Sequence, residues 1–367
     1  MMRHLSVHAV VDAGIAAGWL PADAHERARA ALAQAAREDT PWYLRVLIGG
    51  AAWFAALFLL GAVLGLVALA LGDRVDVAAV LLGLGMMPAG VLLRAGSRHE
   101  LGRQTALVLV ICGQLLLVGG LGAIAESTTL VLGVLAATCA ALIIVFDDAV
   151  YRFAAALTVI GAGLWLAFEW RVPYALGIAT AVTACVPLIA WRVPALRPIH
   201  RLVDPIAWAS AVGVCGLLTT QTIVDAVTGP GGHSEPFLRL LMPTPWPLAV
   251  LFVAMQAWLA LQVAREHDTA PTEPAPAGAI AAIVVIGLLT LSTPAISGAL
   301  LLMVLAFDRR RTGLFGLAAA FLVGFLGLYY YSLALTLLQK SGILVASGAV
   351  CLAAAAFFHI QAKKVAA

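Results

Sequence analysis

Charged residues are scarce in this sequence. Asp, Glu, Lys and Arg make up only 11% of the 367 residues, whereas soluble domains contain about 25%. Hydrophobic residues account for 63% of the chain, more than the interior of a water-soluble domain of this length can hold. The composition therefore excludes a soluble globular domain and a disordered chain, and it predicts a protein that crosses a membrane many times.

Motifs of catalysis and metal binding are also missing. The cysteines form no CxxC pair and no His/Cys spacing of a zinc site, and each lies in an apolar run, as small buried side chains do. They are Cys112, Cys139, Cys185, Cys215 and Cys351. No Walker, GxSxG or HExxH motif is present. We therefore expect no enzymatic activity, no metal and no cofactor, and the net charge of +3 is too small to indicate nucleic-acid binding.

Long apolar segments fill most of the chain. A hydrocarbon layer of about 30 Å needs about 20 helical residues, and this length divides the sequence into twelve candidate spans. They are 44–71, 75–95, 104–124, 128–146, 153–168, 172–191, 205–227, 246–264, 277–291, 294–307, 313–331 and a last one that ends near His359. A lipid-facing backbone must satisfy its hydrogen bonds within a helix, so we predict an all-α, polytopic bundle of about twelve transmembrane helices. For the short pair at 277–291 and 294–307, a re-entrant hairpin is the alternative.

The basic residues predict how this bundle is oriented, because cytoplasmic loops collect Lys and Arg. With twelve spans and both termini in the cytoplasm, 18 of the 22 basic residues fall on the cytoplasmic side and 4 on the other. A shift of one helix would exchange the sides of all later loops, so the asymmetry supports this arrangement. Trp191 and Trp208 fall at predicted cytoplasmic boundaries, where interfacial aromatic residues are enriched.

Three regions follow from this arrangement: a cytoplasmic amphipathic segment at 1–41, a first transmembrane half at 42–200 and a second at 201–367, with six helices each. Segments 144–148 and 304–308 both end a span with Phe-Asp and precede arginine. This echo indicates two parallel halves, and coincidence at a common type of loop is the competing interpretation. The Pro-rich segment 269–277 is predicted to be an extended, exposed loop.

Lys340 is the candidate for a polar site inside the membrane. A last helix that begins at Leu333 would place Lys340 about 10 Å inside it. Thr336, Lys340 and Ser347 share one helical stripe, which favours a bundle-facing cation that pairs with an acidic residue or binds an anion. The acidic candidates on the same outer side are Glu126, Glu169 and Asp225. The competing interpretation places Lys340 at the outer boundary, as an interfacial residue.

Two ends of the chain carry a family resemblance. The run Phe-Asp-Arg-Arg-Arg at 307–311 leads into Gly-Phe-Leu-Gly-Leu-Tyr-Tyr-Tyr-Ser-Leu at 324–333, followed by Leu-Leu-Gln-Lys-Ser at 337–341. With Pro-Trp-Tyr-Leu-Arg at 41–45, this pattern resembles an uncharacterised family of bacterial polytopic membrane proteins, domain of unknown function family 4401. The resemblance covers nearly the whole chain. It implies a multi-pass protein of the bacterial cytoplasmic (inner) membrane and supplies no established activity.

Two functions of different classes are consistent with these features, and both require the lipid bilayer as a partner. The number of spans, the parallel halves and Lys340 indicate a transporter or permease for an unidentified small molecule or ion. The poverty of charge within the spans indicates instead a non-transporting scaffold, sensor or assembly partner of another membrane protein. In that case Gln114, Gln221 and Gln256 are explained by hydrogen bonds between helices. A solid bundle would favour the second hypothesis, and an interior cavity at Lys340 the first.

Overall fold

The computed structural model describes residues 74–97, 99–228, 245–270, 273–291 and 293–332, together with 15–18, 26, 54, 58, 61, 62, 65, 345 and 352. Throughout the long described segments the chain is helical, with no strand in them. The helices are α4 (Val75–Gly96), α5 (Glu100–Ile124), α6 (Thr128–Val145), α7 (Ala149–Glu169), α8 (Ala175–Arg192), the 3₁₀ helix η2 (Pro194–Ile199), α9 (His200–Thr228), α11 (Pro245–Glu266), α12 (Pro274–Leu289), α13 (Pro294–Asp308) and α14 (Thr312–Ser332).

The predicted spans from 75–95 to 313–331 each coincide with one of these α-helices. Helices α4 to α9 and α11 are long and apolar enough to cross a membrane, while α12, α13 and the part of α14 up to Leu328 are shorter apolar helices. The first and last predicted spans lie outside the described residues, so the count of twelve stays a prediction. The described part is thus an all-helical bundle of a membrane protein.

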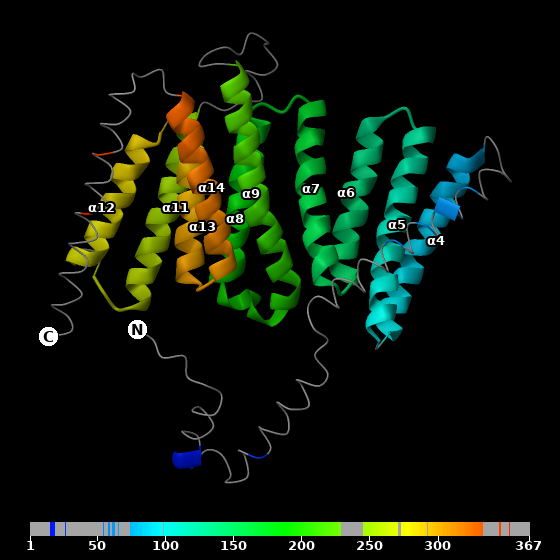
Figure 1. The fold of residues 1–367 in the computed structure, drawn as a ribbon, viewed down its shortest axis with the longest axis horizontal. Helices are drawn as coiled ribbons and strands as arrows, with labels where there is room; N and C mark the ends of the chain where they lie inside the picture. The colour runs from blue at the N-terminus through cyan, green and yellow to red at the C-terminus, as the bar shows by residue number, and fades with distance from the viewer. Residues whose placement is uncertain are drawn as a thin grey trace.

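Helices that follow one another along the chain run in opposite directions, and α4 and α12 lie at the two ends of the described bundle (Figure 1). The described core lies in two clusters. One is formed by α5, α6 and α7, and the other by α8, α9, α11, α13 and α14. Contacts between α7 and α9 join the two clusters. The end of the bundle at which α4, α6, α8, α11 and α13 finish is called the arginine-rich end below.

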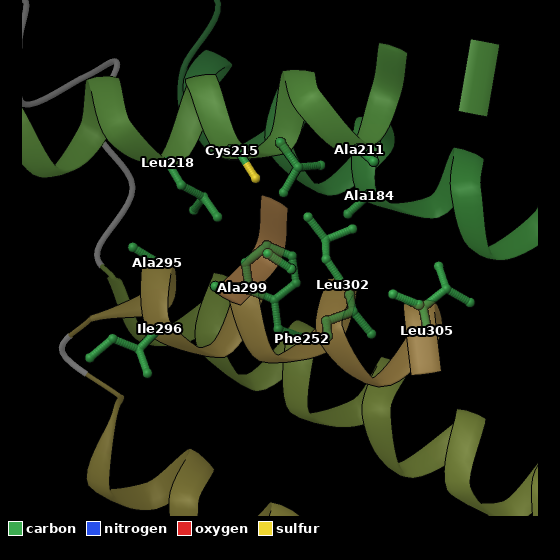
Figure 2. Packing of buried hydrophobic residues seen from close by; sticks show 14 of the residues in the cluster. Ala184, Ala211, Cys215, Leu218, Phe252, Ala295, Ile296, Ala299, Leu302 and Leu305 are labelled. Carbon is green, nitrogen blue, oxygen red and sulfur yellow. The ribbon is translucent and has the colours of Figure 1, made fainter. Parts of the chain in front are cut away.

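The larger cluster is packed from small and large apolar side chains. Figure 2 shows Cys215 and Leu218 of α9 turned toward α13, with Phe252 of α11 filling the space between them. Gly298 of α13 lets these helices approach, because a Cβ there would lie 2.5 Å from Leu218 Cδ1 and 3.0 Å from Phe252 Cε2. Close packing through small residues is how helices associate where lipid removes the hydrophobic driving force.

Helices α4 and α5 approach most closely through glycine. A Cβ added at Gly83 would lie 2.6 Å from the carbonyl oxygen of Gly113 and 2.7 Å from the backbone nitrogen of Leu117. A Cβ at Gly120 would lie 2.6 Å from the carbonyl oxygen of Asp76. Only a residue without a side chain fits at these points, and the two backbones therefore pack directly on each other.

The cysteine prediction is confirmed where the structure describes it. Cys112, Cys139 and Cys215 are buried and unpaired, and Cys185 is half-buried and unpaired. Cys351 lies outside the described residues.

Two predicted boundaries are wrong. The span expected at 205–227 begins at His200, directly after η2. The segment 269–277, expected to be an extended loop, is helical from Pro274 onward. Proline is favoured in the first turn of a helix, where its missing N–H has no intrahelical partner to lose, so Pro274 starts α12 instead of extending the loop.

The short pair α12 and α13 forms two separate helices of 16 and 15 residues. At 1.5 Å per residue they are about 24 Å and about 22 Å long, less than the about 30 Å of a hydrocarbon layer. The structure leaves short spans and a re-entrant hairpin as the two interpretations of this pair.

Candidate functional site

Charged side chains of the arginine-rich end form three groups of ion pairs that together involve helix ends from α4 to α14. We call this set the arginine–carboxylate belt. Its members are Arg94, Asp147, Asp148, Arg152, Arg192, Asp204, Glu266, Asp308 and Arg311. Because these contacts cross between helices, the helix ends that carry the belt lie at the same end of the bundle, as Figure 1 also shows.

The α6–α7 turn is held by two arginines. Asp148 caps α7, since its Oδ1 accepts from the backbone N–H groups of Val150 and Tyr151 at 3.0 and 3.1 Å, which is the role that aspartate favours at a helix start. Arg94 donates through Nε and Nη2 to the carbonyl oxygen of Asp147 at 2.9 and 2.7 Å. Its Nη2 also lies 3.4 Å from Asp148 Oδ2. The end of α4 is thereby tied to the turn.

Arg152 extends this part of the belt to α9. Its buried guanidinium donates to Asp147 Oδ1 at 2.6 Å, and to the carbonyl oxygens of Ile143 at 3.0 Å and Arg201 at 3.2 Å. The last acceptor is free because Pro205, four residues further along α9, has no N–H to donate to it. Proline inside α9 therefore opens the carbonyl that Arg152 uses.

Arg192, in the last turn of α8, is the most buried charged side chain of the belt. It is 4% exposed and pairs with two carboxylates, Glu266 at the end of α11 and Asp308 at the end of α13. Its Nη2 donates to Asp308 Oδ1 at 3.0 Å. A cation here also offsets the partial negative charge of helix C-termini. Three helices thus end around one guanidinium.

Asp204 holds the side chains of Trp191 and Arg311 in place next to Arg192. Its Oδ1 accepts from the indole Nε1–H of Trp191 at 2.9 Å and from Arg311 Nη2. The guanidinium of Arg311 lies 4.4 Å from the centre of the Trp191 ring, a cation–π contact. Trp208 packs edge-on against Trp191 at 6.1 Å between ring centroids. Both tryptophans lie at the arginine-rich end.

The α13–α14 turn presents its arginines through a Schellman motif. The N–H of Arg311 donates to the carbonyl oxygen of Ala306 and that of Arg310 to Phe307. Arg310 occupies the left-handed position with φ 52°, where glycine is usual. The reversal places Arg309 and Arg311 beside a single pocket, while Arg310 is exposed and does not line it.

That pocket has a volume of about 240 Å³ and opens between α8, η2, α9 and the α13–α14 turn. Four arginines line it, together with Trp191, His200 and one carboxylate, Asp204. The arginines are Arg192, Arg197, Arg309 and Arg311. Arginine-rich pockets with one acidic side chain suit anions, because each guanidinium offers several donors and no acceptor. In the part of the chain described, no group of three or more His, Cys, Asp and Glu side chains is placed to hold a metal ion.

Of the residues predicted as a polar site, the structure describes the side chains of Glu126 and Glu169. Lys340, Thr336 and Ser347 lie outside the described residues. Glu126 is exposed in the α5–α6 turn, and Glu169 is exposed at the end of α7. Asp225 lies in the last turns of α9, and its side chain is not described. These acidic residues lie at the end of the bundle opposite the belt, and their pairing with Lys340 stays a prediction.

Buried polar side chains in the spans bond between helices, as expected for Gln114 and Gln256. The Nε2 of Gln114 donates to Thr138 Oγ1 at 3.2 Å and to Cys139 Sγ at 3.0 Å, and its Oε1 accepts from the Tyr151 hydroxyl at 2.9 Å. Gln114 therefore joins α5, α6 and α7.

In the second cluster, Gln256 Nε2 of α11 donates to the carbonyl oxygen of Ser297 in α13 at 2.9 Å. Gln221 differs, since its buried Oε1 has no hydrogen-bond partner among the described residues. The interhelical prediction is confirmed for two of the three glutamines.

The carboxylates of the belt were not predicted as partners of its arginines. The positive-inside pattern counts Lys and Arg only, so Asp204, Glu266 and Asp308 entered no prediction as partners of arginine. The signal was present, because each acidic residue lies at a predicted helix end on the same side as its arginine. The echo at 144–148 and 304–308 did mark two turns of the belt. Asp308, however, pairs with Arg192 of α8, whereas Asp147 pairs with Arg152 of the following helix.

The apolar helices, their exposed apolar side chains and the charged helix ends are those of a multi-pass helical membrane protein. The chain belongs to the family described as domain of unknown function (DUF4401), whose family model matches residues 41–359. The resemblance seen in the sequence is therefore confirmed. Neither the curated proteins nor the solved structures contain a match to this chain.

Proposed function

We propose that this protein is a non-transporting, non-enzymatic component of a bacterial inner membrane, a helical scaffold or sensor that assembles with another membrane protein. In this proposal both termini and the arginine-rich end face the cytoplasm, in keeping with the positive-inside pattern. A transport function is the alternative that the experiment below would reveal.

The observation that carries the proposal is the close apolar packing in the middle of the larger cluster. Cys215 lies eleven residues beyond Asp204 in α9, or about 16 Å along the helix, which is near the middle of a hydrocarbon layer. It is 1% exposed and packs in one cluster with Leu218, Phe252 and Ala299, which are equally buried. A route for a polar solute between α9, α11 and α13 would need polar lining where these apolar side chains meet.

The polar side chains near this depth support the same proposal. Thr219 and Thr222 donate to carbonyl oxygens of their own helix at 2.7 and 2.8 Å, and Gln256 bonds across to α13. The threonine hydroxyls are thus satisfied within their own helix, and Gln256 is satisfied by an interhelical bond of the kind that is common in membranes. Charged side chains of the described spans gather at helix ends instead.

The test measures whether water reaches Cys215. In a variant that keeps Cys215 and replaces the other four cysteines by alanine, the scaffold proposal predicts no reaction with a membrane-impermeant maleimide applied from either side of sealed membrane vesicles. The same thiol should react fully after the protein is unfolded in detergent, which shows that the reagent and the residue are competent.

Two matched control variants carry one cysteine each at exposed positions, His267→Cys in the α11–α12 turn and Glu126→Cys in the α5–α6 turn. The proposed orientation predicts that His267→Cys reacts only from the cytoplasmic side and Glu126→Cys only from the opposite side. Labelling of native Cys215 at a rate close to that of either control would show a water-filled route through the core and would overturn the scaffold proposal.

A further inference from the structure

We propose that the pocket at the arginine-rich end binds an anion that carries a phosphate group. The pocket is the one between α8, η2, α9 and the α13–α14 turn, lined by four arginines. This inference goes beyond the proposed function and does not depend on it, because a ligand site at the end of the bundle is compatible with a solid core or with a route through it.

Positive charge remains in the pocket after all nearby carboxylates are counted. Asp204 pairs with Arg311, and Glu266 and Asp308 pair with Arg192, with Asp308 Oδ2 also 2.9 Å from Arg309 Nε. Three carboxylates thus face four lining arginines. Arg197, on the exposed 3₁₀ helix, forms no ion pair with any described residue. Arg201, Arg265 and Arg310 lie at the same end of the bundle outside the pocket, as do Asp268 and Glu273 of the α11–α12 turn.

One buried guanidinium nitrogen of a residue that lines this pocket lacks an acceptor. The Nε of Arg192 has no hydrogen-bond partner among the described residues, although the side chain is only 4% exposed. The Nε of Arg309, by contrast, lies 2.9 Å from Asp308 Oδ2 in an ion pair. Buried donors are normally satisfied, so Arg192 retains hydrogen-bonding capacity beside the pocket that the described chain does not use.

Phosphate is the anion that this arrangement fits best. Its tetrahedral oxygens accept the paired N–H groups of guanidinium forks. Arg311 is held in place by Asp204 and by its stacking on Trp191, so little side-chain entropy is lost when it binds. The volume of about 240 Å³ equals that of roughly eight water molecules, enough for a phosphate group with a few waters.

Two sources of phosphate have access to this position. A tryptophan-lined pocket at a helix end lies at the depth of lipid headgroups, and basic pockets between helices on the cytoplasmic side bind anionic headgroups. The same opening also admits a soluble phosphate compound. Both share the chemistry of a phosphate ester or free phosphate, and the experiment separates them.

The experiment uses full-length protein and two probes. Native mass spectrometry of protein from phosphatidylcholine nanodiscs, with and without phosphatidylglycerol, measures retention of the anionic lipid. Calorimetric titration in neutral detergent measures the dissociation constant of inorganic phosphate at fixed ionic strength. The pocket variants are Arg197→Gln and Arg309→Gln. The control variants Arg265→Gln and Arg310→Gln remove the same charge from the same face outside the pocket.

We expect each pocket variant to bind the recognised probe about tenfold more weakly, the effect of losing one charge-assisted hydrogen bond, and each control to change binding by less than about twofold. Retention of phosphatidylglycerol alone would identify a lipid site, and binding of inorganic phosphate alone a soluble ligand. Equal weakening in pocket and control variants would overturn the proposal, as would failure of the wild type to bind either probe. Arg197 is exposed on η2, so its variant keeps the test valid if Arg309→Gln does not fold.

Discussion

Replacing Arg192 tests whether burial decides the strength of the ion pairs in the belt. Arg192→Met keeps much of the side-chain volume and removes the charge that Glu266 and Asp308 share. The two carboxylates differ in exposure, 55% for Glu266 and 13% for Asp308. Water can solvate Glu266 when its partner is lost, whereas Asp308 would keep only Arg309, whose Nε is 2.9 Å from Oδ2.

The magnitude follows from this asymmetry. Removing one partner of a buried pair costs about 3–5 kcal/mol, and an exposed pair contributes about 0.2–1 kcal/mol. Because Asp308 retains slight exposure and a second cation, we expect Arg192→Met to lower the free energy of unfolding by about 2–3 kcal/mol. In double-mutant cycles, the coupling of Arg192 to Asp308 should be about 1.5–3 kcal/mol and its coupling to Glu266 about 0.5 kcal/mol.

The assay is unfolding by sodium dodecyl sulfate in mixed micelles, followed by the loss of tertiary structure. It compares Arg192→Met, Asp308→Asn, Glu266→Gln and the two double variants that contain Arg192→Met. Arg265→Met, an exposed neighbour on the same face, should change stability by less than about 0.5 kcal/mol. Equal coupling to both carboxylates, or stronger coupling to Glu266, would refute the reasoning that burial sets the strength of these pairs.

Three further predictions concern packing and backbone. Gly83→Ala should destabilise the bundle by about 1–3 kcal/mol, because its Cβ would lie within 2.7 Å of the backbone of α5. The control Gly85→Ala, whose Cβ would meet nothing within 4 Å, should leave the stability unchanged. Equal melting temperatures of the two variants would contradict the close approach of α4 and α5 at Gly83. Tyr151→Phe should cost about 1 kcal/mol by removing the donor to Gln114 Oε1, and an unchanged unfolding midpoint would show that this bond contributes nothing. Arg310→Gly should raise stability by about 0.5–1 kcal/mol by relieving the left-handed backbone at φ 52°, and a lower melting temperature would show that the Arg310 side chain matters more than its backbone.

The positions of the helices could be predicted from the sequence because the lengths of the apolar segments determine them. A lipid-facing backbone must be helical over the thickness of the bilayer, so the apolar lengths between charged turns give each helix within a few residues. The errors fell at ends, where this property no longer decides. Pro274 starts a helix inside a segment of loop-like composition, and η2 continues into α9 before the apolar run begins.

The belt and its pocket could not be predicted in the same way. Which arginine meets which carboxylate depends on the lateral order of the helices, and that order does not follow the chain. Helix α11 packs against α13 as well as against α12, and α8 brings Arg192 to Asp308 across 116 residues. Hydropathy gives the depth of a residue and its end of the bundle, but it carries no information about which neighbour stands beside it.

The preference for arginine over lysine is better explained by the hydrogen bonds that arginine forms between helix ends than by the orientation of the protein in the membrane. Either lysine or arginine satisfies the positive-inside pattern, yet 19 of the 22 basic residues are arginine. Arg94 uses two nitrogens on one carbonyl oxygen, and Arg152 spans a carboxylate and two carbonyl oxygens at once. A lysine ammonium is a single point of charge without such a fork. Substitution by lysine would therefore keep the charge asymmetry of the loops while breaking the bonds that hold helix ends together, so arginine at these positions serves tertiary structure.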